Sequence, residues 1–95
     1  MFMKQQVACE LCGRHCLLTF HHLIPKKMHR RSFFRSHYSK AELQNGVMLC
    51  VTCHKTIHRF YDEMTLAKRF NTLYALQADE KIQSYLVWVK KQKIQ

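Results

Sequence analysis

Two Cys-x-x-Cys pairs constrain the fold of this chain more than any other feature. Cys9 and Cys12 form the first pair, and Cys50 and Cys53 form the second. Zinc prefers four tetrahedral ligands, so the four thiolates predict a closed structural zinc site that joins two distant segments. A chain of 95 residues buries only a modest core, and domains of that size often rely on a bound metal for stability.

The cysteines leave two alternatives to this zinc site. The pairs could instead form disulfides, or Cys16 could pair with Cys12 in place of one ligand, although we expect Cys16 to be a free, partly buried thiol. Residues 1–8 show no signal-peptide pattern, and no apolar run approaches the roughly 18 residues that a membrane span requires. We therefore expect a cytoplasmic protein with no membrane association, where paired cysteines are typically metal ligands.

The positive charge of the chain is strongly localised. The formal net charge is +10, and residues 25–41 contain several lysines and arginines without one acidic residue. A basic segment beside metal-capable residues indicates a polyanionic partner, most simply nucleic acid, whose phosphates the cations contact. The alternative is a solvated basic surface that serves only solubility.

Two short apolar stretches predict the strands of a small sheet. Residues 17–20 are apolar and partly β-favouring, and a strand there delivers His21 and His22 at its end. Residues 47–49 predict a second strand, which leads directly into Cys50. The two strands therefore bring the first histidines and the second cysteine pair to one small unit.

The connection between these strands carries one clear helix signal. Residues 24–38 form either an ordered loop or a short helix. Ser39 followed three residues later by Glu42 matches a capping box, which starts a helical turn. That turn is expected to end at Asn45 and Gly46, with Gly46 in a left-handed C-terminal position.

The remainder of the chain is predicted to be helical. A helix beginning at Thr52 or Cys53 presents His54 and His58 one turn apart on one face. Residues 62–93 predict two amphipathic helices that pack on the metal module. The apolar stripe of the first helix is Leu66, Phe70, Leu73 and Tyr74, and that of the second is Ile82, Tyr85, Leu86 and Val89. Asp79 is the expected N-cap between the two helices. Trp88 lies beside the second stripe.

The histidines exceed what a structural zinc site needs. A zinc finger with two cysteines and two histidines requires about twelve residues between its two pairs, and no such spacing occurs here. His54 and His58 can instead bind a second ion from one helix face, while His21 or His22 approaches it from the strand. One of two adjacent histidines can then bind metal while the other acts as a base.

The whole pattern resembles the HNH endonuclease family. It reads Cys-x-x-Cys, His-His-x-x-Pro, an asparagine five residues before the next cysteine, and Leu-Cys-x-x-Cys-His-x-x-x-His. The resemblance covers residues 9–58 and implies an α+β fold, a small zinc-stapled ββα-metal core. We expect one domain over residues 1–95, in which residues 62–93 form a C-terminal helical extension of that core.

The resemblance also implies roles for individual residues. His22 matches the general base that activates water, and His21 matches the metal ligand before it. Asn45 matches the residue that holds the loop and orients the base. His54 matches the ligand at the start of the helix, and His58 matches a final position that ligates metal or contacts phosphate.

The implied activity is metal-dependent hydrolysis of DNA phosphodiester bonds, with double-stranded DNA as the expected partner. The catalytic divalent ion could be Mg²⁺, Mn²⁺, Ni²⁺ or Zn²⁺, and the all-imidazole ligand set suits transition metals better than Mg²⁺. The residues expected to hold flanking phosphates are Lys26, Lys27, Arg30, Arg31 and Arg35.

Two other functions are compatible with the sequence. The first is a nucleic-acid-binding zinc module of the same fold without catalytic activity, which needs the cysteines and the basic segment but not His22. The second is a protein-interaction module that uses the C-terminal helices and Trp88. The sequence does not define an oligomeric state.

Overall fold

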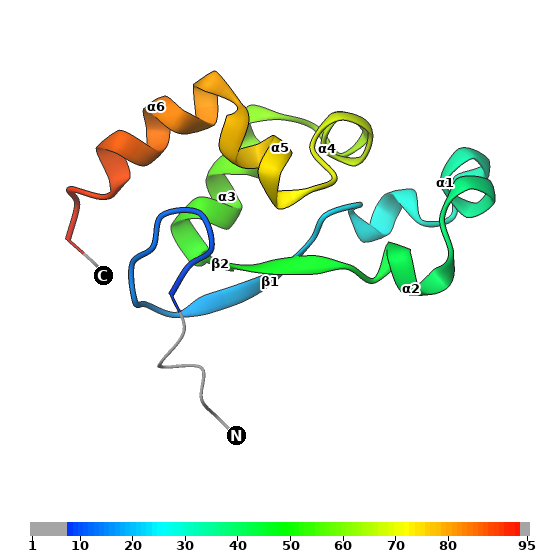
Figure 1. Cartoon of the computed structure of the whole chain (residues 1–95), viewed down its shortest axis with the longest axis horizontal. Coiled ribbons are helices and arrows are strands. Elements are labelled where there is room, and N and C mark those ends of the chain that lie inside the picture. The colour runs from blue at the N-terminus through cyan, green and yellow to red at the C-terminus, as the bar shows by residue number, and fades with distance from the viewer. Residues whose placement is uncertain (1–7, 94–95) are drawn as a thin grey trace.

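A computed structural model describes residues 8–93 and centres on a two-stranded antiparallel sheet (Figure 1). The elements in chain order are β1 (Leu18–His22), a 3-10 helix η2 (Lys26–Met28), α1 (Ser32–His37), α2 (Lys40–Leu43), β2 (Gly46–Cys50), α3 (Val51–Phe60), α4 (Glu63–Arg69), α5 (Leu73–Ala78) and α6 (Glu80–Val89). The expectation that no signal peptide is present concerns mainly residues 1–7, which lie outside the described residues. Within residues 8–93, no helix combines the length and apolarity needed to cross a membrane.

The sheet and α3 form the predicted ββα unit. β1 pairs with β2 so that Thr19 lies opposite Leu49 and His21 lies opposite Val47. β2 runs directly into α3, because the Cys50 side chain caps the helix by accepting a hydrogen bond from the Cys53 amide at 3.4 Å. The predicted mixed α/β fold is therefore confirmed, and α3 starts one residue earlier than the pattern indicated.

The segment between the strands contains three short helices at the end of the molecule opposite α6 (Figure 1). Residues 24–38, for which the sequence predicts either a loop or a short helix, contain both η2 and α1. The capping box is confirmed, since Ser39 Oγ accepts from the Glu42 amide at 3.1 Å and Glu42 Oε1 accepts from the Ser39 amide at 2.8 Å.

The expected left-handed conformation of Gly46 is wrong. Among the described residues only Gly13, in the turn after the first cysteine pair, has a positive φ, at 78°. Gly46 instead begins β2 opposite His22, where a Cβ atom would collide with the Phe20 ring and the His21 carbonyl. The position therefore requires glycine because of a close approach across the sheet, not because of a turn.

Two clusters of buried side chains hold the elements together. The larger cluster joins the first cysteine pair, the sheet, α3 and the C-terminal helices; it includes Leu11, Val47, Leu49, Ile57, Leu66, Phe70, Leu76, Ile82, Tyr85, Leu86 and Val89. The smaller cluster lies under the segment between the strands and consists of Ile24, Met28, Phe34, Leu43 and Ala67, with Tyr38 and Met64 packed against it. Since Leu66 belongs to one cluster and Ala67 to the other, α4 connects the two.

The C-terminal extension contains three helices where the sequence predicted two. The expected first helix is divided because Phe70 leaves the helical conformation, with φ −128° and ψ 41°, and the Thr72 side chain caps a new helix. Tyr74 is consequently 78% exposed and does not belong to the apolar stripe. Asp79 caps α6 as predicted, and Trp88 is 56% exposed on that helix.

Candidate functional site

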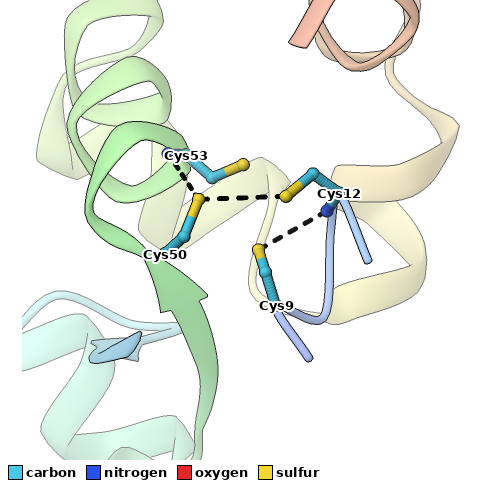
Figure 2. A group of neighbouring side chains, drawn as sticks. All are labelled: Cys9, Cys12, Cys50 and Cys53. Carbon is cyan, nitrogen blue, oxygen red and sulfur yellow. Dashed lines mark hydrogen bonds between the residues drawn. The ribbon is translucent and has the colours of Figure 1, made fainter. Parts of the chain in front are cut away.

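The four cysteines of the two pairs converge on one point. Their sulfur atoms all lie within 4.8 Å of one another, and all four residues are buried. Figure 2 shows the side chains pointing inward, with Cys9 and Cys12 on the N-terminal turn, Cys50 at the end of β2 and Cys53 in the first turn of α3. Four buried sulfurs from two segments are the donor set that a tetrahedral zinc ion requires.

Hydrogen bonds to the sulfurs show that the cluster fits a metal ion. The Cys12 amide donates to Cys9 Sγ at 3.4 Å, as the Cys53 amide does to Cys50 Sγ. A hydrogen bond from the Cys53 thiol and several backbone donors lower the pKa of the Cys9 thiol, whereas the same bond and burial raise the pKa of Cys53, and burial raises that of Cys12. Without an ion the four sulfurs therefore share protons, and the backbone amides are the donors that favour thiolates. Donors aimed at sulfur favour the thiolate form, which is the form that binds zinc.

Two side chains add further donors to this cluster. Arg14 Nε lies 3.3 Å from Cys12 Sγ, and its Nη2 lies 3.6 Å from Cys50 Sγ. The buried Tyr85 hydroxyl donates to Cys53 Sγ at 3.3 Å. A zinc ion held by four thiolates would carry a net charge of −2, and the Arg14 guanidinium would compensate part of that charge.

The alternatives for the cysteines are not seen in the described structure. All five cysteines are free, and Cys12 Sγ lies 3.8 Å from Cys50 Sγ, far beyond a disulfide bond. Cys16 lies outside the cluster, where its thiol donates to the Arg14 carbonyl at 3.7 Å. Burial raises the pKa of Cys16 to about 11, so it remains a neutral thiol.

A second cluster consists of three histidines. His21 on β1 meets His54 and His58 on α3, and one ring nitrogen of each lies within 4.8 Å of the others. The ring centroids are 5.1 to 5.3 Å apart. The i, i+4 spacing of α3 and the sheet register therefore bring together the three residues that the sequence predicted as ligands.

His21 lacks the partner that a buried polar atom normally has. Its side chain is 1% exposed, and Nε2 makes no hydrogen bond within the described residues. Burial, together with the neighbouring histidines, lowers the pKa of His21 to about 3, so the ring is neutral. An unpaired, neutral imidazole nitrogen facing two further imidazoles fits a bound transition-metal ion.

The tautomer of His54 follows from its hydrogen bond to Thr19. Thr19 Oγ1 lies 2.9 Å from the Leu49 carbonyl and 2.8 Å from His54 Nδ1. A hydroxyl has one hydrogen and a carbonyl can only accept, so Thr19 donates to Leu49 and accepts from His54. His54 Nδ1 therefore carries the proton, which leaves Nε2 with the lone pair that a metal needs.

His22 lies in the same cleft as the three clustered histidines. This cleft of about 220 Å³ is lined by Phe20, His21, His22, Pro25, Lys26, Lys27, His54, His58 and Glu63. His22 Nε2 is 3.3 Å from Gln44 Oε1, an acceptor, so Nε2 donates and Nδ1 keeps its lone pair. Asn45 is exposed, and its backbone carbonyl accepts from the Leu23 amide at 3.1 Å, which ties the two strand ends together.

The predicted phosphate-binding residues divide into two groups. Lys26 and Lys27 line the histidine cleft, and both also line an adjoining cleft with His29 and Arg30. Arg31 and Arg35 are exposed around the start and end of α1 and line neither cleft. The basic segment therefore extends outward from the histidines.

Three residues at this site were missed by the sequence analysis. Thr19 shares a strand face with His21, two residues away, so the period of the strand could have indicated it. Gln44 precedes Asn45, but nothing in the sequence singles it out. Glu63 lies beyond the motif and reaches the cleft only through the packing of α4.

The comparison with known families decides the classification. Residues 9–60 match the family model described as HNH endonuclease. The chain belongs to the HNH endonuclease family. It is also 38% identical over 93 residues to the uncharacterized protein YisB of Bacillus subtilis (strain 168), covering 95% of this chain and 82% of that relative. No solved structure matches the chain.

Proposed function

We propose that this HNH family member is a metal-dependent endonuclease that hydrolyses DNA phosphodiester bonds. The observation that carries this proposal is a single cleft that holds three converging imidazoles, a fourth histidine beside them and two lysines. A purely structural cluster would have no need for an unpaired buried nitrogen on His21. The family match over residues 9–60 supports the same activity.

In the proposed mechanism His22 is the general base. Gln44 accepts from His22 Nε2 and so directs the Nδ1 lone pair to the attacking water, from which it takes a proton. His21, His54 and His58 would hold the divalent ion, which supplies Lewis-acid stabilisation of the charge on the phosphate and the leaving 3′ oxygen. Asn45 holds the loop that carries Gln44 against the end of β1.

The basic segment positions the substrate. Lys26 and Lys27 line the cleft that contains His22 and would contact the phosphates next to the scissile one. Arg30, Arg31 and Arg35 continue the positive surface and would contact phosphates further along the strand. Contacts of this kind give affinity for any sequence and weaken as salt increases.

The experiment compares plasmid cleavage by the wild type, His22→Ala and His15→Ala over a series of Mg²⁺, Mn²⁺, Ni²⁺ and Zn²⁺ concentrations. His15 is exposed and serves as the matched histidine control. Loss of the general base should reduce the cleavage rate about a hundredfold to ten-thousandfold. Circular dichroism and zinc content check that folding is unchanged. Wild-type activity in His22→Ala would refute the proposed role.

A non-catalytic nucleic-acid-binding module is the second candidate, and the basic segment is the observation that favours it. That function predicts DNA binding that weakens steeply with salt, is unchanged in His22→Ala and is accompanied by no cleavage with any of the four metals. The same set of proteins therefore distinguishes the two functions.

A further inference from the structure

The Glu63 carboxylate lines the histidine cleft, whose candidate metal ligands are otherwise all imidazoles. Glu63 is the first residue of α4, and it lines the same cleft as His21, His22, His54 and His58. It lies beyond residues 9–60, the part of the chain that matches the HNH family model. The carboxylate therefore comes from the C-terminal extension and not from the family motif.

Packing fixes the position of Glu63. Its neighbour Met64 packs against the small core cluster that contains Met28 and Ala67, and α4 contacts η2 there. Lys27 precedes Met28 in η2, and Glu63 precedes Met64 in α4. The contact between η2 and α4 therefore brings Lys27 and Glu63 together. Their Nζ and Oε1 atoms are 3.4 Å apart, which is the one salt bridge found among residues 8–93.

This ion pair is too exposed to be a strong structural contact. The Lys27 side chain is 73% exposed and that of Glu63 is 39% exposed, and pairs of this kind add little to stability. The Glu63 side chain also lines the cleft that contains the three clustered histidines, so its carboxylate has a second charged partner within that cleft once an ion binds there. A divalent ion at the histidines can therefore compete with Lys27 for this carboxylate.

We propose that Glu63 supplies an oxygen ligand to the divalent ion held by His21, His54 and His58, and that Lys27 holds this carboxylate until the ion binds. The inference rests on the proposed function, because it assumes that the three histidines bind an ion. Carboxylate oxygen suits Mn²⁺ and Mg²⁺, whereas imidazole suits Ni²⁺ and Zn²⁺. Glu63 thus shifts the preference of the site towards the harder ions.

Calorimetric titration of the zinc-loaded protein with Mn²⁺ and, separately, with Ni²⁺ tests this proposal. The variants are Glu63→Gln, Lys27→Met and the double variant, with Glu80→Gln as an exposed acidic control at the start of α6. Glu63→Gln should weaken Mn²⁺ binding at least about tenfold and Ni²⁺ binding clearly less. Lys27→Met should bind Mn²⁺ at least as tightly as the wild type, and the double variant should remain weak.

Two results would overturn the role of Glu63. One is Mn²⁺ affinity in Glu63→Gln equal to that of Glu80→Gln. The other is wild-type Mn²⁺ affinity in the double variant, since Glu63 would then act only by neutralising Lys27. In both cases, unchanged Ni²⁺ binding would still support a metal site at the three histidines. If the wild type bound neither metal beyond its zinc, the proposed metal centre and the role of Glu63 would fail together.

Discussion

Replacing Thr19 with valine tests how the strand prepares His54 for metal binding. Thr19 Oγ1 accepts a hydrogen bond from His54 Nδ1 at 2.8 Å and donates one to the Leu49 carbonyl at 2.9 Å. Valine has nearly the same shape and favours a strand, so β1 should be retained. The substitution removes both hydrogen bonds and leaves the tautomer of His54 unspecified.

The expected magnitude follows from the two bonds. Loss of the bond to Leu49 should lower the free energy of unfolding by about 1 kcal/mol, as for an ordinary neutral hydrogen bond. Loss of the partner that orients a metal-binding histidine typically weakens metal binding about tenfold to a hundredfold. That range corresponds to about 1.4 to 2.8 kcal/mol of binding free energy. The effect on metal affinity should therefore exceed the effect on stability.

Two measurements check this prediction on the zinc-loaded protein. Calorimetric titration with Ni²⁺ gives the affinity, and long-range ¹H–¹⁵N spectra of the imidazoles report which nitrogen of His54 carries the proton. Thr19→Ser keeps the hydroxyl and should behave as the wild type does. Thr52→Val makes the same chemical change at an exposed position of α3 and serves as the control. The wild-type spectrum should show the proton on Nδ1.

A wild-type proton on Nε2 of His54 would refute the reasoning directly. Equal Ni²⁺ affinities for Thr19→Val and Thr52→Val would also refute it, because the hydroxyl would then have no influence on the metal centre. If Thr19→Val and Thr19→Ser lost Ni²⁺ affinity equally, the cause would be altered packing of the strand and not the lost hydrogen bond.

Two further predictions concern the side chains around the cysteine cluster. Arg14→Met should release zinc to a chromogenic chelator faster than the wild type does, because two sulfurs lose a charged hydrogen-bond donor. The free energy of unfolding should also fall by about 1.5 kcal/mol. Lys55→Met on α3 is the control. Tyr85→Phe removes a buried hydroxyl that donates to one sulfur at 3.3 Å, and should cost about 1 kcal/mol in thermal unfolding. Tyr74→Phe, at an exposed position, should cost nothing, and equal effects of the two tyrosine substitutions would contradict the assigned hydrogen bond.

The parts of the site that the sequence predicted are those that short-range geometry determines. A Cys-x-x-Cys turn places its two sulfurs on one side of the chain, and residues four apart on a helix share a face, as His54 and His58 do. The capping box at Ser39 and the cap at Asp79 were predicted for the same reason, since each motif is complete within four residues.

The errors arose where long-range packing determines a residue. Gly46 is predicted as a turn residue, but the His21 carbonyl and the Phe20 ring of the neighbouring strand exclude a side chain there. The division between α4 and α5 was missed because the apolar spacing continues through Phe70 to Leu73, although Thr72 caps a new helix. Glu63 could not be connected with the histidines, because only the packing of α4 against η2 brings it to the cleft.

The cysteine and histidine clusters depend on the same short elements. Cys53 and His54 are adjacent on α3, so an ion at the cysteines that fixes the first turn of the helix also fixes the helix face that carries His54 and His58. The third histidine, His21, lies on the strand paired with β2, and β2 ends at Cys50. A larger enzyme fixes such distances with an extensive core, which a chain of 95 residues does not have. Here an ion at the four cysteines would take that role at one end of α3, while α4, packed into both buried clusters, brings Glu63 to the histidine cleft at the other end.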